Sequence, residues 1–292
     1  MRTVLMAVLS VSALSYGQSV ISAHSGVVQY VEGDVTIDHQ EIHPKFAEFP
    51  DVKPNQVIAT EEGRVELLLT PGVFLRLAED SSVRMISNSL ADTRLEMVSG
   101  SALIEVAELL ANNSITFEAK GTQIVLPRKG LYRIDSDPGR LRVYDGQAMV
   151  AGTPVRKGHE VALGESTAVA AAFDAKDTDS FYRWSARRAD YVAEANVESA
   201  RVANNPMSSG YVGGIASPNG MWSWNPGFGM FTYLPGSGMY MSPFGSTYYS
   251  TMMVPMYIPV GGVTSAANSA PVSAAPLARG AGVSIGRAGR AR

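Results

Sequence analysis

Short apolar segments separated by glycine recur between Gly26 and Val150, and this pattern constrains the fold more than any other feature of the chain. Within each segment the residues alternate or run apolar over a length typical of a β-strand. The pattern therefore predicts a block of β-strands, which favours a binding or scaffold module over an enzyme. The clearest predicted strands are 65–69, 73–77, 102–106, 115–117 and 141–144.

Turn residues divide this block further. A polar insert at 38–55 contains three prolines. We expect it to be irregular because proline has no backbone N–H to donate a hydrogen bond to a neighbouring strand. Pro71-Gly72 lies between two apolar segments, which predicts a β-hairpin. One further strand around Gly158 would complete a β domain that we place at 26–173.

The first residues resemble a secretory signal. A basic residue, Arg2, precedes an apolar run at 4–14, and small residues follow it. The run is too short for a membrane-spanning helix, which needs about 20 apolar residues. We therefore predict a signal peptide at 1–17 and an exported protein that is periplasmic, associated with the outer membrane or extracellular. The alternative is that these residues remain as an uncleaved anchor.

Composition excludes several functional classes. The net charge is −3 and the pI is about 5.8, so the chain lacks the excess of positive charge that attracts a nucleic acid. The chain has no cysteine, which rules out disulfides, thiolate zinc sites and a catalytic thiol. We expect no nucleic-acid partner and no cofactor.

The periodicity changes after the β block. Residues 177–204 favour a helix, with Asp177, Thr178 or Asp179 available as the N-cap. Such a helix either docks on the β domain or lies on a partner surface. Its predicted contact face carries Phe181, Trp184, Arg188, Tyr191 and Ala195.

The rest of the chain has an unusual composition. No charged residue lies between Arg201 and Arg279, and glycine, proline, methionine and aromatic residues dominate 206–262. Frequent glycine and proline break regular elements, so we predict turns, extended pieces and no independent core there. We predict that 263–292, which is rich in alanine, serine, glycine and arginine, is disordered.

The aromatic residues of 206–262 are the candidate contact residues. Their flat apolar faces and polar edges suit stacking on a glycan, a lipid headgroup or another protein. Alternatively, they fold back over the β domain. The predicted contact residues are Trp222, Trp224, Phe228, Phe231, Tyr233, Tyr240, Tyr248 and Tyr249.

No catalytic or metal-binding pattern is evident. His39 and His43 have the spacing of helical zinc ligands but lie in a proline-marked loop. The carboxylate pairs Glu61 and Glu62, Glu105 and Glu108, and Asp135 and Asp137 are expected at turns or on solvent-facing strand positions, where they keep the β surface soluble. The segment 135–139 either turns a hairpin or binds calcium weakly.

The predicted strand segments and the glycines between them resemble the FecR-type periplasmic domain over residues 26–150. The similarity is carried by Gly26-Val27-Val28 through Gly33-Asp34-Val35, by 63–67 with 72–77, by 81–85, by 95–104 and by 141–150. The resemblance implies an all-β domain, built as a twisted β-sandwich or a short solenoid-like stack, without catalytic residues. Regulators of this family carry an anti-sigma segment and a spanning helix before the domain, and residues 1–25 show neither.

These observations lead to two functional hypotheses. The first is a non-enzymatic exported module that acts as a cell-envelope scaffold or binding protein, with the aromatic segment contacting an envelope protein, a glycan or the membrane. The second is an envelope-signalling regulator that senses a partner protein through the β domain. An uncovered edge strand would also permit a homo-oligomer or the addition of a partner's strand.

Overall fold

The computed structural model describes residues 24–43, 48–165, 168–204 and 220–254. A first compact unit runs from Met1 to Tyr257, and a second unit, Ile258–Arg292, lies outside the described residues. The predicted signal peptide at 1–17 and the predicted disordered stretch at 263–292 also lie outside them. No helix in the described part of the chain has the length and apolar character needed to cross a membrane.

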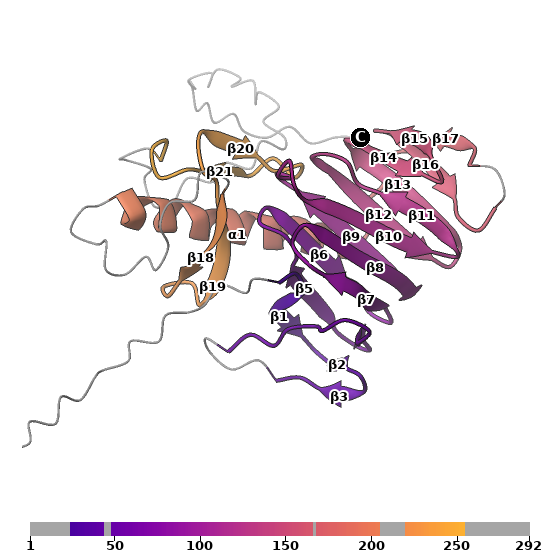
Figure 1. The fold of residues 1–292 in the computed structure, drawn as a ribbon, viewed down its shortest axis with the longest axis horizontal. Coiled ribbons are helices and arrows are strands. Elements are labelled where there is room, and N and C mark those ends of the chain that lie inside the picture. The colour runs from indigo at the N-terminus through magenta and orange to yellow at the C-terminus, as the bar shows by residue number, and fades with distance from the viewer. Residues whose placement is uncertain (1–23, 44–47, 166–167, 205–219, 255–292) are drawn as a thin grey trace, which may run out of the picture. The chain divides into compact units, whose positions relative to one another are not determined.

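Eight strands form the first sheet, in the order β1-β5-β6-β9-β12-β13-β16-β17 (Figure 1). Every neighbouring pair in it is antiparallel. Its strands are β1 (Val27–Glu32), β5 (Arg64–Leu68), β6 (Val73–Leu77), β9 (Ser101–Val106), β12 (Gly130–Ser136), β13 (Gly139–Asp145), β16 (His159–Ala162) and β17 (Ala170–Ala172).

Nine strands form the second sheet, in the order β15-β14-β11-β10-β8-β7-β4-β2-β3. The pair β10 and β8 is parallel, whereas its other neighbouring pairs are antiparallel. Its strands are β2 (Val35–Ile37), β3 (Gln40–Glu41), β4 (Val57–Thr60), β7 (Ser82–Asn88), β8 (Asp92–Ser99), β10 (Ser114–Ala119), β11 (Thr122–Val125), β14 (Gln147–Val150) and β15 (Thr153–Arg156).

The two sheets enclose one apolar core. Because side chains alternate along a strand, every second residue points inward. The first sheet supplies residues such as Leu67, Leu75 and Ile104, and the second supplies residues such as Met85 and Phe117, to one buried cluster. The molecule is therefore an all-β sandwich followed by one helix, which confirms the fold class predicted from the sequence.

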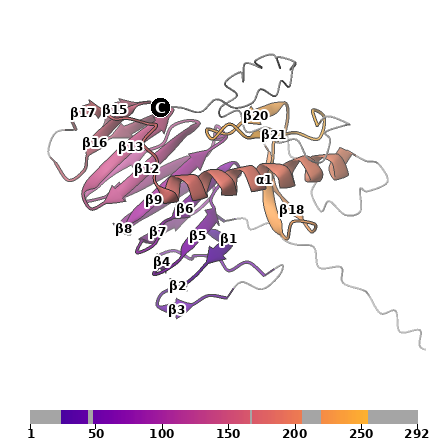
Figure 2. The ribbon, with the colours of Figure 1, turned by 180° about the vertical axis from the view of Figure 1, so that it is seen from behind.

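A C-terminal cap lies on the outer face of the first sheet. We use this name for α1 (Ser180–Asn204) with the two hairpins β18 (Met221–Asn225) and β19 (Met230–Leu234), and β20 (Met239–Met241) and β21 (Thr247–Tyr249). Figure 2 shows α1 running across this side of the molecule, beside the hairpins. The helix begins where the backbone N–H of Tyr182 donates to Asp179 Oδ1 at 2.8 Å, as expected for an N-cap.

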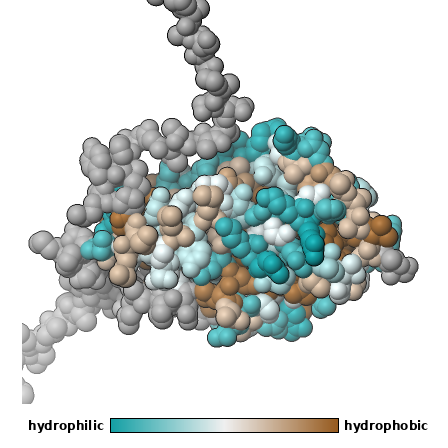
Figure 3. Space-filling view, turned by 90° about the horizontal axis from the view of Figure 1, so that it is seen from above, coloured by the Kyte–Doolittle hydropathy of each residue, from teal (hydrophilic) through white to brown (hydrophobic). Residues whose placement is uncertain are grey.

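The cap is more regular than the sequence predicted. Residues 221–249 form two hairpins, although glycine and proline predicted mainly turns and extended pieces there. The difference arises because their side chains pack against the helix and the sandwich, so the segment needs no core of its own. Hydrophilic and hydrophobic residues interleave on the face shown in Figure 3.

Candidate functional site

Charged residues lie on the face of the first sheet that the cap covers. The inward residues Leu67, Leu75 and Ile104 belong to the sandwich core. Alternation therefore places their neighbours Glu66, Arg76 and Glu105 on the opposite, outer face. All three are fully buried, because the cap excludes water from a surface that would otherwise face solvent.

These residues form a buried charge network with one arginine of the helix. Arg76 Nε donates to Glu66 Oε2 at 2.8 Å, and Arg76 Nη1 donates to Glu105 Oε2 at 2.7 Å. From α1, Arg188 Nη2 donates to Glu66 Oε1 at 2.8 Å. Two carboxylates thus face two guanidiniums, and the formal charges of the four side chains balance.

Burial alone would raise the pKa of Glu66. The charges of Arg188 and Arg76, together with hydrogen bonds from Arg188 and Gln29, outweigh burial and lower the pKa to about 2. Burial would likewise lower the pKa of Arg76, but Glu66 and Glu105 raise it above its ordinary value. Glu66 and Arg76 therefore remain charged at neutral pH, so this pair fixes charge in place rather than exchanging protons.

Both hairpins of the cap also bind the network. The Ser242 hydroxyl, just after β20, donates to Glu105. Gln29 on β1 links the other hairpin, because its Nε2 donates to Glu66 Oε1 at 3.2 Å while its Oε1 accepts from the backbone N–H of Phe231 at 3.0 Å. The network is thus where the sheet, the helix and both hairpins meet.

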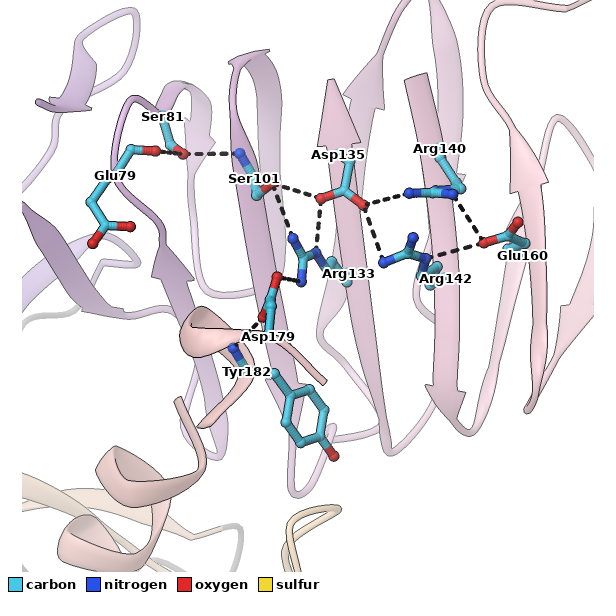
Figure 4. A network of polar contacts seen from close by, with 10 residues as sticks. All are labelled: Glu79, Ser81, Ser101, Arg133, Asp135, Arg140, Arg142, Glu160, Asp179 and Tyr182. Carbon is cyan, nitrogen blue, oxygen red and sulfur yellow. Dashed lines mark hydrogen bonds and ion pairs between the residues drawn. The ribbon is translucent and has the colours of Figure 1, made fainter. Parts of the chain in front are cut away.

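A second polar network lies near the start of the helix (Figure 4). Arg133 Nε donates to Asp135 Oδ1 at 2.8 Å, and another nitrogen of Arg133 pairs with the helix N-cap, Asp179. Farther along the sheet, Arg142 Nε donates to Glu160 Oε2 at 3.1 Å. This network anchors the first turn of α1 to β12, and its charges are also paired.

The predicted contact residues are placed within the fold. Trp222, Phe231, Tyr233 and Tyr248 are buried. Trp222 packs edge-on against Phe74 on the outer face of the first sheet, with their ring centroids 5.1 Å apart. The remaining predicted contact residues, Trp224, Phe228, Tyr240 and Tyr249, are half-buried. Of the two alternatives, the structure shows packing over the β domain, and contact of these residues with a partner stays a prediction.

Two carboxylates differ from the sequence expectation. Glu105 and Asp135 were expected at turns or on solvent-facing positions, but both are buried. The expectation was wrong because it assumed a solvated outer face, whereas Ser242, 137 residues away along the chain, contacts Glu105, and Arg133 and Ser101 contact Asp135. Asp137 does lie in the turn between β12 and β13, so 135–139 forms a hairpin.

Sequence reasoning did not identify the charge network. A signal was present: Glu66, Arg76 and Glu105 each interrupt an apolar strand, and their signs are complementary. The register then places Glu66 opposite Arg76 on neighbouring strands. The histidines do not join it, because His39 lies in the turn between β2 and β3 and His43 pairs with Glu41 at 3.4 Å. Among the described residues, no group of histidine and carboxylate side chains has the arrangement of a metal site.

Comparison with known proteins gives limited similarity. No protein-family model matches the chain, and no curated protein matches it. Two solved structures of a "putative anti-sigma factor" from Parabacteroides distasonis ATCC 8503, at 1.65 and 2.50 Å resolution, are similar at 13% identity, with TM-scores of 0.36 and 0.35. They match 41% and 40% of this chain, which spans about three fifths of their length (61% and 59%). At this level the similarity carries no argument about function, and the FecR resemblance remains a prediction.

Proposed function

We propose that this chain is a non-enzymatic cell-envelope protein that binds a partner protein through its β domain, as a signalling regulator does. The observation that supports this choice is the burial of Trp222, Phe231, Tyr233 and Tyr248 in the cap. These rings would have to leave their packing before they could contact anything else. A partner therefore meets the β domain more readily than the aromatic segment.

The second sheet offers a surface for such a partner. Apart from Ser82, its outward side chains on β7 and β8 are exposed or half-buried, whereas the cap packs on the first sheet. Ile86 and Val98 are large apolar residues exposed on these central strands. The pair Arg84 and Glu96, joined at 2.5 Å, lies between them in the register. A protein-binding surface typically has an apolar centre and a polar rim, and Ile86 and Val98 are the candidates for that centre.

The non-enzymatic part of the proposal is supported by the paired charges. General acid–base catalysis needs a group whose pKa lies near the working pH. Glu66 has a pKa of about 2, and the pKa of Asp179 is also lowered, by its hydrogen bonds from Tyr182 and Arg133 and by charge, despite partial burial. Neither carboxylate is a proton donor at neutral pH.

The proposed location is the cell envelope after export. Fractionation of the expressing cell, with mass spectrometry of the N-terminus in each fraction, tests this location. We expect a mature N-terminus near Gln18 in the periplasm, outer membrane or medium. An intact Met1 in the inner membrane would instead mean that the apolar run is an uncleaved anchor, and a cytoplasmic full-length chain would contradict the proposed location.

Site-specific photo-crosslinking in intact cells tests the binding surface. A photoreactive residue at Val98 on β8 should capture one envelope protein, and the added substitution Ile86→Glu should abolish capture because it places a charge in the apolar contact. A photoreactive residue at Ser237, which is exposed between the two hairpins, is the matched control and should capture nothing. Capture from Ser237 alone would favour the scaffold hypothesis and contradict binding through the β domain.

A further inference from the structure

Exposed methionines gather on the second hairpin of the cap. Met239 and Met241 on β20 are 61% and 58% exposed, and Met252 and Met253 in the following turn are 85% and 50% exposed. These four are half of the large hydrophobic side chains that are exposed in the described part of the chain. Elsewhere in the cap, apolar side chains such as Met230 and Tyr248 are buried, and all four exposed methionines belong to the second hairpin and the turn that follows it.

The backbone brings the turn that carries Met252 and Met253 beside the Met239 end of β20, and Met241 lies two residues nearer the loop of the hairpin. Met239 and Met241 are two residues apart on one strand, so both side chains point to the same face at a spacing of about 6.6 Å. The backbone N–H of Ser250 donates to Gly238 O at 3.0 Å, which joins the chain before Met252 to the chain before Met239. A turn then forms, in which Met253 N–H and Val254 N–H both donate to Ser250 O at 3.1 Å.

The chemistry of this surface selects a soft ligand. Residues 220–254 contain no cysteine, histidine or charged side chain, so the thioethers are their only side-chain ligands for a soft metal ion. Calcium, magnesium and zinc prefer oxygen, imidazole or thiolate ligands, whereas thioether sulfur suits Cu⁺. Methionine has a flexible side chain, so neighbouring sulfurs can converge on one ion.

We propose that Met239 and Met241, completed by a thioether from the turn at 252–253, form a binding site for a soft monovalent cation of the Cu⁺ class. This site is independent of the partner surface proposed on the second sheet. Val254 holds the turn in place, because it is buried against Ala200 of α1 and Leu234 of β19. Two of the ligands thus lie on a paired strand and the third on an anchored turn.

Titration of the full chain with Ag⁺, a redox-stable probe with the same preference for sulfur, tests the site. We expect saturable binding of one ion, with shifts in the ¹³C-methyl NMR signals of Met239 and Met241. The double variant Met239→Leu with Met241→Leu should bind at least about tenfold more weakly. Met252→Leu with Met253→Leu should also weaken binding, and Met149→Leu on the distant strand β14 should not.

Leucine replacements separate coordination from apolar contact, because leucine has a similar volume but no sulfur. Tryptophan fluorescence of each variant confirms that the cap remains folded. Wild-type affinity in the Met239 and Met241 variant would overturn the proposal, as would the absence of saturable Ag⁺ binding by the native chain. Equal competition by Zn²⁺ would also overturn it, because thioethers would then not determine selectivity.

Discussion

Arg76 is the residue on which the buried charge network depends most. It is fully buried between Glu66 and Glu105. Breaking a buried ion pair by removing one partner is costly, because the remaining charge has no compensation. We predict that Arg76→Met lowers the free energy of unfolding by about 3–5 kcal/mol, measured by chemical denaturation.

Arg94→Met is the matched control for that measurement. Arg94 pairs with Asp92 at 3.1 Å on the second sheet, and about half of each side chain is exposed. An exposed pair contributes little, so this variant should lose less than about 1 kcal/mol. Equal losses in the two variants would mean that the charge network under the cap is not shielded from water.

The low pKa of Glu66 makes stability depend on pH in a defined window. The folded-state pKa of about 2 lies below the ordinary value of 4.5. The stabilisation is therefore complete above the unfolded value and is lost as the pH falls from 4.5 toward 2. We predict that the free energy of unfolding decreases across this window in the native chain, and that Glu66→Gln has a smaller slope there. Parallel slopes would contradict the low pKa.

At the scale of the elements, Asn196 joins the helix to both hairpins. Its side chain is fully buried, and its Nδ2 donates to the carbonyl oxygens of Tyr233 at 2.8 Å and Tyr249 at 3.0 Å. Its Oδ1 accepts from the backbone N–H of Tyr249 at 2.7 Å. One side chain thus hydrogen-bonds to backbone groups of both β19 and β21.

Replacing this side chain should loosen the hairpins selectively. We predict that Asn196→Ala costs about 2–4 kcal/mol, because each unsatisfied buried group costs about 1–3 kcal/mol. Hydrogen exchange should accelerate at the amides of β19 and β21 more than at those of β9. Glu194→Ala, at an exposed position on the same helix, is the control. Uniform acceleration across the sandwich would contradict a local role.

Local sequence patterns predicted the strands and the helix but not which of them pack against one another. Pro71-Gly72 identified the hairpin between β5 and β6, and Asp179 was among the predicted caps of the helix. The burial of Glu105 was missed because its cover, Ser242, lies 137 residues away in the sequence. The predicted role of the aromatic residues remained open because composition cannot distinguish a ring that packs internally from one that contacts a partner.

At the scale of the whole molecule, the cap and the sandwich share their buried groups. Phe74 of the sheet packs between Trp222 and Tyr248 of the cap, and Arg188 of the helix completes the charge network of the sheet. The aromatic segment therefore acts as part of the fold, and we propose the second sheet as the surface for a partner. Loss of the cap would expose both apolar rings and paired charges, so we expect cap and sandwich to unfold together.

The most direct measurement of this central claim compares two probes of one unfolding transition. All three tryptophans of the chain, Trp184, Trp222 and Trp224, lie in the cap, whereas the ¹³C-methyl NMR signals of Met85 and Met97 report the sandwich core. We predict that tryptophan fluorescence and these methyl signals change at the same denaturant concentration. A fluorescence transition at a clearly lower concentration, while the sheets remain folded, would show that the cap is a separable element and would contradict the account.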